Sequence, residues 1–178
     1  YDPETGWRNL DGSARVRARV THIDFQDSEY VLGINMRLPV RVYAYRDDGT
    51  RTQITDDVRF EVTNAGIAQV AEGNPNPGQI TPFRSGSVSV DAIDEERNLR
   101  ASASLGRATI RVTGYLQNLL INPQSVRIGD SRNARVYGEL STGATTNDMR
   151  RVVEWRSLNP SIASVTNTSS NPGEISGI

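Results

Sequence analysis

The sequence predicts an all-β protein made of two tandem antiparallel β-sandwiches. Short segments with alternating apolar and polar side chains run through the chain, and turns rich in Gly, Pro and Asn separate them about every ten residues. This combination is typical of an antiparallel sandwich. A second observation, an internal repeat, indicates that the same set of strands forms twice.

The repeat is clearest between residues 58–83 and residues 152–178. Phe60 matches Trp155 and Gly78 matches Gly173, and each pair lies 95 positions apart (155 − 60 and 173 − 78). Both stretches have the pattern of a strand, a tight corner, a second strand and a Pro-Gly turn. A repeat of 95 residues (155 − 60) gives copies that are each large enough to bury a core.

The repeat divides the 178 residues into three parts. Residues 1–20 are predicted to be the closing segment of a preceding domain or an N-terminal arm, residues 21–114 a first domain, and residues 115–178 a second domain. The second copy has no counterpart of residues 84–114, so we expect it to lack its last two strands. The short connector at residues 115–117 predicts domains that are nearly end to end with limited freedom.

The first predicted strand is Ala14–Val20, in which three arginines, Arg15, Arg17 and Arg19, alternate with apolar residues. An arginine stripe for polyanions is the functional alternative, but a solvated strand face explains the pattern. This segment resembles the stretch at 108–113 that precedes the second repeat, which is why we assign it to the end of a preceding domain.

The remaining strands follow in chain order. Residues 21–25 and their twin at 118–122 place apolar side chains on one face. Leu38–Tyr45 and its twin Asn133–Leu140 are each predicted as one strand leading into a Gly-containing turn. In the first copy alone, the stretches Ser87–Asp94 and Leu99–Gly114 add two further strands.

The apolar residues of the repeat predict one core in each copy. For the first copy these residues are Val58, Phe60, Ile67, Val70 and Ile80, and for the second they are Val153, Trp155, Ile162, Val165 and Ile175. Trp155 is therefore interpreted as a core residue. A ring for stacking on sugar must be exposed, and Trp7, in the loop-like N-terminal part, is the tryptophan that fits.

Composition excludes several classes of function. The charges nearly balance, with 20 Lys and Arg against 21 Asp and Glu, and the basic residues are scattered, so a nucleic-acid footprint is not supported. Every basic residue is Arg, which excludes chemistry through a Lys amine, and the absence of Cys excludes disulfides and thiolate sites. No apolar run approaches the roughly 20 residues that a membrane span requires.

Candidate site residues are few. The single histidine, His22, argues against a His-based triad or zinc site, since these use several ligands or oriented partners. Asp47, Asp48, Asp56 and Asp57 are acidic enough to suggest calcium, but they lack EF-hand spacing, and the second copy has Ser and Thr in place of the first two. Turn chemistry explains them. We therefore assign no catalytic, cofactor-binding or metal-binding residue.

The stretches LLINPQSVRIG, RVYGELSTG, VVEWRSLNPSIASV and PGEISGI together resemble the bacterial immunoglobulin-like domain, group 2. The resemblance is close over residues 116–178 and looser over 21–114, where Phe60 replaces the Trp of the Trp-x-Ser-x-Asn-Pro corner and Ala65 replaces its Pro. It implies two tandem immunoglobulin-like sandwiches, the second without its last two strands.

The resemblance implies a non-catalytic structural or binding module that spaces, docks or adheres within a larger extracellular, cell-surface, periplasmic or virion assembly, with proteins as partners. Two alternatives remain. One is an accessory module of a secreted enzyme, and the other is a polymer subunit in which Ala14–Val20 of one copy completes the second domain of another. We expect chain beyond Ile178 to cover that domain instead. Carbohydrate is a partner that no motif supports, and the sequon at Asn167 has little weight.

Overall fold

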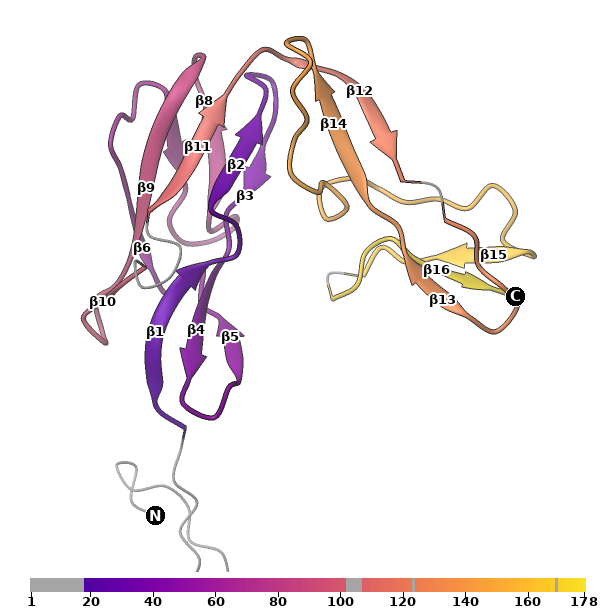
Figure 1. Cartoon of the computed structure of the whole chain (residues 1–178), viewed down its shortest axis with the longest axis horizontal. Coiled ribbons are helices and arrows are strands. Elements are labelled where there is room, and N and C mark those ends of the chain that lie inside the picture. The colour runs from indigo at the N-terminus through magenta and orange to yellow at the C-terminus, as the bar shows by residue number, and fades with distance from the viewer. Residues whose placement is uncertain (1–17, 102–106, 123, 169) are drawn as a thin grey trace, which may run out of the picture.

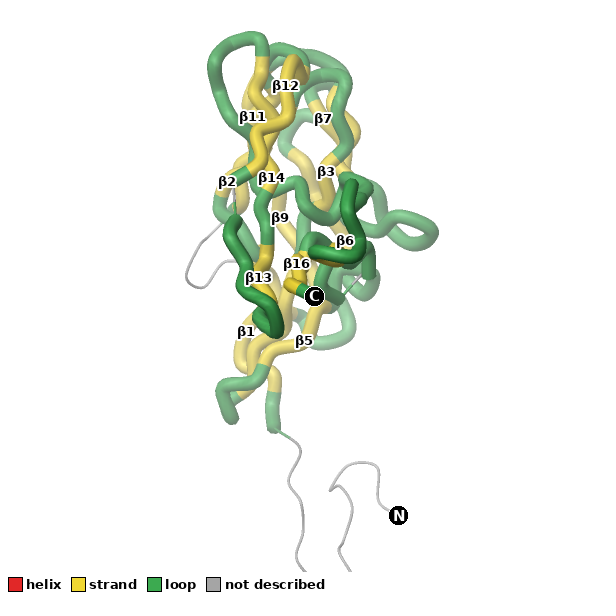
Figure 2. Tube along the Cα trace, turned by 90° about the vertical axis from the view of Figure 1, so that its right-hand side faces the viewer, coloured by secondary structure: helices red, strands yellow, loops and turns green. Residues whose placement is uncertain are grey.

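The computed structural model describes residues 18–101, 107–122, 124–168 and 170–178. Over these residues the protein is all-β, with sixteen strands and no helix (Figures 1 and 2). The all-β part of the predicted fold class is confirmed. The cause is the period-2 alternation, which suits a strand that has one face toward a core.

We call strands β1–β11 the first repeat and strands β12–β16 the second repeat. The first contains β1 (Val20–Phe25), β2 (Glu29–Leu32), β3 (Leu38–Pro39), β4 (Val42–Arg46), β5 (Arg51–Gln53), β6 (Arg59–Val62), β7 (Ala68–Val70), β8 (Gln79–Pro82), β9 (Gly86–Asp94), β10 (Leu99–Arg100) and β11 (Ala108–Val112). The second contains β12 (Leu116–Ile121), β13 (Ser131–Asn133), β14 (Val136–Leu140), β15 (Ala163–Val165) and β16 (Glu174–Gly177).

Every strand pairs within its own repeat among the described residues. In the first repeat, two three-stranded sheets have the orders β1-β4-β5 and β3-β8-β7, and a five-stranded sheet has the order β10-β9-β11-β2 with β6 also on β9. The second repeat contains the pair β12-β14 and the sheet β13-β16-β15. All pairs are antiparallel except β11 with β2, which is parallel.

The sequence repeat is reproduced in the backbone. Val70 of β7 pairs with Ile80 of β8, and Val165 of β15 pairs with Ile175 of β16. The turns that join these strands are also alike, because the glycine of each Pro-Gly turn has a φ of 77° and its N–H donates a 2.8 Å bond to the backbone oxygen of the residue seven positions earlier. Gly is needed there because this φ is left-handed.

The prediction of one strand over Leu38–Tyr45 is wrong. The chain forms β3 and β4 and passes from one sheet to another between them, where Val40 N donates to Gly78 O at 2.8 Å. The second repeat does the same between β13 and β14, where Ala134 N donates to Gly173 O at 2.8 Å. At each break the chain makes its last backbone bond to the strand of the Pro-Gly turn and then pairs with a strand of another sheet.

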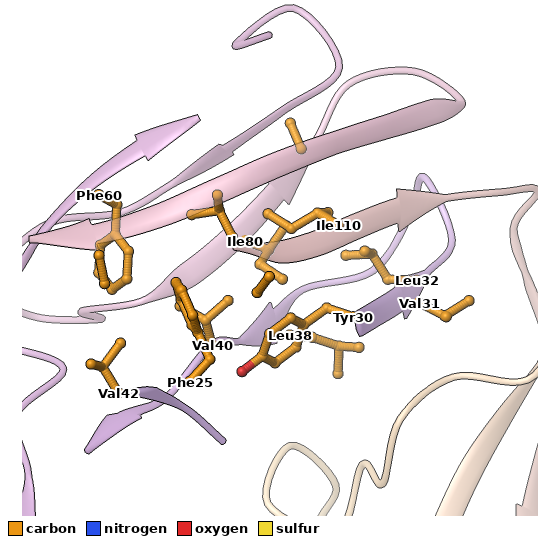
Figure 3. Packing of buried hydrophobic residues seen from close by; sticks show 14 of the residues in the cluster. Phe25, Tyr30, Val31, Leu32, Leu38, Val40, Val42, Phe60, Ile80 and Ile110 are labelled. Carbon is orange, nitrogen blue, oxygen red and sulfur yellow. The ribbon is translucent and has the colours of Figure 1, made fainter. Parts of the chain in front are cut away.

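The core of the first repeat lies where the five-stranded sheet meets the two three-stranded sheets (Figure 3). Val58, Phe60 and Ile80 are buried there, as predicted, and Ile67 and Val70 are half-buried against the same cluster. The strand predicted over Ser87–Asp94 is confirmed as β9, the longest strand in the described residues. Apolar side chains from both sides of the sandwich-like interior therefore stabilise this repeat.

The predicted core of the second repeat is only partly correct. Ile162 is 64% exposed, so its assignment to the core is wrong. Val153 and Trp155 are half-buried against the main cluster, and Val165 and Ile175 are also half-buried. The buried apolar residues of this repeat are instead Ala134, Val136, Leu140 and Met149. Val136, Leu140 and Met149 belong to the cluster that continues into the first repeat, whereas Ile162 does not pack against it.

Some predictions fall on other parts of the chain. Most of the segment Ala14–Val20, together with Trp7, lies outside the described residues, and Val20 is the first residue of β1. Within the predicted stretch Leu99–Gly114 the structure has β10 and β11, and residues 102–106 between them are also outside the described part.

Candidate binding cleft at the junction of the repeats

The first repeat makes direct backbone contact with the connector between the repeats. Ile34 N, just after β2, donates to Gly114 O at 2.9 Å. Gly33 packs on the connector so closely that a Cβ at this position would lie 2.9 Å from the Cα of Tyr115. Any larger residue at position 33 must therefore push the connector away. This close contact leaves little room for the repeats to move independently.

Hydrogen bonds on both sides hold the connector. Leu116 N donates to Asn35 Oδ1 of the first repeat at 3.0 Å. On the other side, Ser141 N donates to Tyr115 O at 2.9 Å, and Tyr115 N donates to Ser141 Oγ at 3.1 Å. The turn after β14 and the loop after β2 thus bind the same three-residue connector.

Asn147 fastens the second repeat to an open strand edge. Strand β2 pairs with β11 on one side, and on the other side Val31 N donates to Asn147 Oδ1 at 2.8 Å while Asn147 Nδ2 donates to Glu29 O at 2.7 Å. One side-chain amide therefore supplies the acceptor and donor that a neighbouring strand would supply. This arrangement also protects the edge of β2 from other partners.

The hydrophobic cluster continues across the junction. Val136, Leu140 and Met149 of the second repeat belong to the same buried cluster as the core of the first repeat, and Leu116 packs against it. The two repeats meet where β11 leads into β12 and diverge from that point, so the chain is bent at the junction (Figure 1). The end-to-end arrangement expected from the connector length is therefore wrong. The connector is short, but a shared apolar patch turns the second repeat back toward β2.

A cleft of about 450 Å³ lies between the repeats next to this patch. Its charged residues are Asp27, Arg41 and Arg51 from the first repeat and Asp148, Arg150 and Arg151 from the second. Four arginines thus face two aspartates in a chain whose overall charge is close to zero. The cleft is more positive than the protein as a whole.

The charges in the cleft perturb one another. Burial lowers the pKa of Arg151, and the positive charges of Arg41 and Arg150 lower it further. Burial also raises the pKa of Asp27, although a hydrogen bond from Gln26 and the charge of Arg41 act in the opposite direction. Both shifts indicate partial desolvation of the cleft, and the shift of Arg151 also reflects the neighbouring positive charges.

The two aromatic rings of the cleft already have partners. The guanidinium of Arg51 lies over the Tyr43 ring, 4.6 Å from its centroid, in a cation–π contact. Tyr30 is only 2% exposed, its hydroxyl accepts a hydrogen bond from Arg41 N at 3.4 Å, and burial raises its pKa. One face of the Tyr43 ring is therefore occupied by Arg51, and the Tyr30 ring is buried.

The residues considered from sequence lie elsewhere. The His22 ring stacks on Tyr45 with centroids 4.8 Å apart, and its Nδ1 is 3.0 Å from Thr21 Oγ1. Asp48 accepts hydrogen bonds from the N–H and hydroxyl of Thr50 at 2.9 and 2.7 Å, which is the turn chemistry we expected. Within the described residues, no group of three or more His, Cys, Asp or Glu could hold a metal ion.

Asn167, the sequon residue, has a structural contact in the repeat. Its Nδ2 donates to Trp155 O at 2.6 Å and its Oδ1 accepts from Trp155 N at 2.7 Å. The first repeat uses Glu72 in the equivalent place, where Glu72 Oε1 accepts from Phe60 N at 2.8 Å. The amide nitrogen that glycosylation would modify is thus engaged in holding the chain next to Trp155.

No sequence motif indicates the cleft. Its arginines and aspartates are distributed over residues 27–51 and 148–151 and become neighbours only through the bend at the junction. The adjacent pair Arg150 and Arg151 is the one local signal, and it is too common to indicate a site.

In the part of the chain that the structure describes, there is no helix with the length and apolar character needed to cross a membrane.

No family model matches this chain, and no curated protein matches it. Solved structures of the S-layer protein SbsC are similar. Its domains 5-6 match with a TM-score of 0.48 at 11% identity, covering 91% of this chain and 86% of that chain. Its domains 4-9 match with a TM-score of 0.45 at 12% identity, covering 90% of this chain and 27% of that chain. These scores are too low to carry an argument about function, so the resemblance to the bacterial immunoglobulin-like family stays a prediction.

Proposed function

We propose that the chain is a non-catalytic structural and docking module, made of two tandem immunoglobulin-like domains at residues 21–114 and 115–178, in a larger extracellular, cell-surface or periplasmic assembly. The observation that carries this proposal is the fixed junction between the repeats. A flexible linker is sufficient for a module that only tethers its neighbours. A module that sets the orientation of its neighbours needs a defined angle between its two repeats.

The contacts at the junction supply such an angle. Backbone hydrogen bonds hold the connector, Asn147 binds the edge of β2, and apolar residues of both repeats share one cluster. Interfaces between domains of one chain are often small and polar and permit motion, but a shared apolar core restricts it. The equivalent hydrogen bonds in the two repeats support the tandem arrangement.

Distance measurements between the repeats test the proposal. The protein has no Cys, so Gln53→Cys and Arg132→Cys place one spin label on each repeat, on exposed strand residues. Double electron–electron resonance should then give one narrow distance distribution. Asn147→Ala should broaden it, because the contact with β2 is lost, whereas Asn118→Ala, which removes a bond to Glu139 within the second repeat, should not. A broad distribution in the parent protein would contradict the proposal.

A second candidate function, a subunit that accepts a strand from another copy, is favoured by the apolar surface of the second repeat. Leu119, Ile121 and Ile128 are exposed there, whereas Ile23 and Phe25, the counterparts of the first two, are fully buried in the first repeat. If this surface accepts a strand, light scattering should show oligomers that grow with concentration and disappear in Leu119→Glu. A monomer at every concentration would rule this function out.

A further inference from the structure

We propose that the cleft between the repeats binds an acidic peptide segment of a partner protein, with Asp or Glu carboxylates entering among Arg41, Arg51, Arg150 and Arg151. The inference extends the docking role proposed above and names the chemistry that the site recognises. It depends on the bend at the junction, because only this bend brings arginines from both repeats to one place.

The arrangement of charge favours an anionic ligand. Planar guanidinium groups bind carboxylates through paired hydrogen bonds, and such charge-assisted bonds are stronger than neutral ones. Arg150 Nε lies 3.2 Å from Asp148 Oδ2, so one of the two aspartates is already engaged within the cleft. Four arginines against two aspartates leave an excess of positive charge that an added carboxylate would balance.

The surroundings of Arg151 supply a reason for affinity. Burial and the nearby Arg41 and Arg150 disfavour its charged form. A carboxylate placed among these three groups adds an attraction that offsets the repulsion between them. The site is also partly removed from water, so the attraction is screened less than on an open surface.

The covered rings distinguish an acidic peptide from an acidic sugar or a nucleic acid. Sugars and bases bind proteins largely by stacking on open aromatic faces. One face of the Tyr43 ring is covered by Arg51, and Tyr30 is buried with its hydroxyl facing Arg41 N. What remains accessible is a set of guanidinium groups beside the apolar side chain of Val152, which suits the methylene and carboxylate groups of Glu.

The size of the cleft agrees with this ligand. About 450 Å³ lies toward the low end of the roughly 300–1,000 Å³ range of ligand pockets. The volume suits a few side chains of an extended segment rather than a folded domain. The partner should therefore present an exposed acidic loop or tail.

Fluorescence anisotropy with a fluorescein-labelled hexaglutamate peptide tests the inference on the intact chain at low ionic strength. We expect saturable binding that weakens as salt is added, because exposed charges are screened. The double variant Arg51→Gln, Arg151→Gln should bind about a hundredfold more weakly, since each lost charge-assisted contact accounts for roughly tenfold. Neither side chain is fully buried, and circular dichroism melts should show that the variant folds.

Two matched variants sharpen the test. Asp27→Asn removes a negative charge from the cleft and should tighten binding of the hexaglutamate peptide about two- to threefold, as expected for one partly screened charge. Arg156→Gln removes an arginine of the second repeat outside the cleft, and its affinity for the peptide should equal that of the parent protein.

Three outcomes would overturn the inference: no binding of hexaglutamate, unchanged binding in the double arginine variant, or tighter binding of polygalacturonate or a single-stranded oligonucleotide at the same arginines. The spin-label distances separate this result from the proposed module function. A narrow distribution without peptide binding would refute the acidic-peptide site alone, whereas a broad distribution would refute the fixed junction itself.

Discussion

The two repeats have the same sequence pattern at one stretch but a different structure. Residues 59–62 form β6, whereas residues 154–157, the equivalent stretch, form no strand. Strand β6 exists because it pairs with β9, with Phe60 opposite Ala92. The described part of the second repeat has no strand that corresponds to β9. Alternation of side chains is therefore not sufficient for a strand, because the backbone also needs a partner.

The stretch that precedes β3 in the first repeat and β13 in the second also differs in structure between the repeats. Leu32 ends β2, which pairs with β11, and it is 0% exposed. Ile128, its counterpart 96 positions later (128 − 32), makes only an isolated bridge with Gly177 and is 84% exposed. By contrast, the sheets β3-β8-β7 and β13-β16-β15 agree in register, because each contains all of its partners within the repeat.

Removal of the two equivalent aromatic rings should have the largest effect and should separate the repeats. Phe60→Ala is expected to lower the free energy of unfolding by about 3–5 kcal/mol, as large core truncations do. Trp155→Ala should cost less, about 1–3 kcal/mol, because its ring is half-buried, although its Nε1 donates to Arg150 O at 2.9 Å. Urea unfolding followed by circular dichroism measures both. An equal or larger loss for Trp155→Ala would contradict the difference in burial.

Truncation of the equivalent aliphatic residues Leu32 and Ile128 should have the next largest effect on stability. Leu32→Ala removes a fully buried side chain and is expected to cost about 2–5 kcal/mol. Ile128→Ala removes an exposed one and should change stability by less than about 0.5 kcal/mol. Thermal melts of the two variants give the comparison directly. A large loss for Ile128→Ala would mean that this residue is covered in solution.

The two turn glycines should differ by a smaller amount. Both have a left-handed φ of 77°, so Ala at either position is expected to cost about 1 kcal/mol in backbone strain. At Gly78 the new Cβ would also lie 2.6 Å from Val40 O, a backbone atom, whereas at Gly173 it would meet the Trp155 ring at 2.8 Å. A ring can shift more easily than a strand, so Gly78→Ala should be the more destabilising. Chemical denaturation of both variants checks the order.

A double variant isolates the contact at the second turn. In a Trp155→Ala background the ring that meets the new Cβ is gone, so Gly173→Ala should cost less than it does in the parent protein. The two changes should therefore be non-additive. Additive losses would show that the strain at Gly173 comes from φ alone.

Asp27→Asn should have the smallest effect on the free energy of unfolding. The aspartate occurs in the first repeat alone, since the second has Pro123 in the matching sequence position (123 − 27 = 96). Burial raises its pKa in the folded protein. A carboxyl group with a raised folded pKa stabilises the fold below its unfolded pKa, and this contribution is lost as the pH rises through the folded value. The unfolding free energy of the parent protein minus that of Asp27→Asn should therefore increase as the pH falls from 7 to about 4. Urea titrations at several pH values measure this difference, and a flat difference would contradict the burial of Asp27.

Several features could be predicted from the sequence because they depend on local chemistry. The all-β class, β9 and the turns at Asp48 and the two Pro-Gly pairs follow from alternation and from residues that tolerate a left-handed φ. The repeat itself is visible because the same turn residues recur at a constant spacing. The buried positions of Val58, Phe60 and Ile80 also follow, since these residues alternate on the inner face of strands that have partners.

The tertiary structure alone decided the rest. The break of Leu38–Tyr45 into two strands, the exposure of Ile162 and the loss of a strand at residues 154–157 depend on which distant segments are present to pair or to cover. The cleft depends on a bend made by Asn147 and a shared apolar patch, which brings Arg41 beside Arg151. Side-chain alternation sets the face of a strand on which a residue lies, but burial and site formation require a second surface that no local pattern specifies.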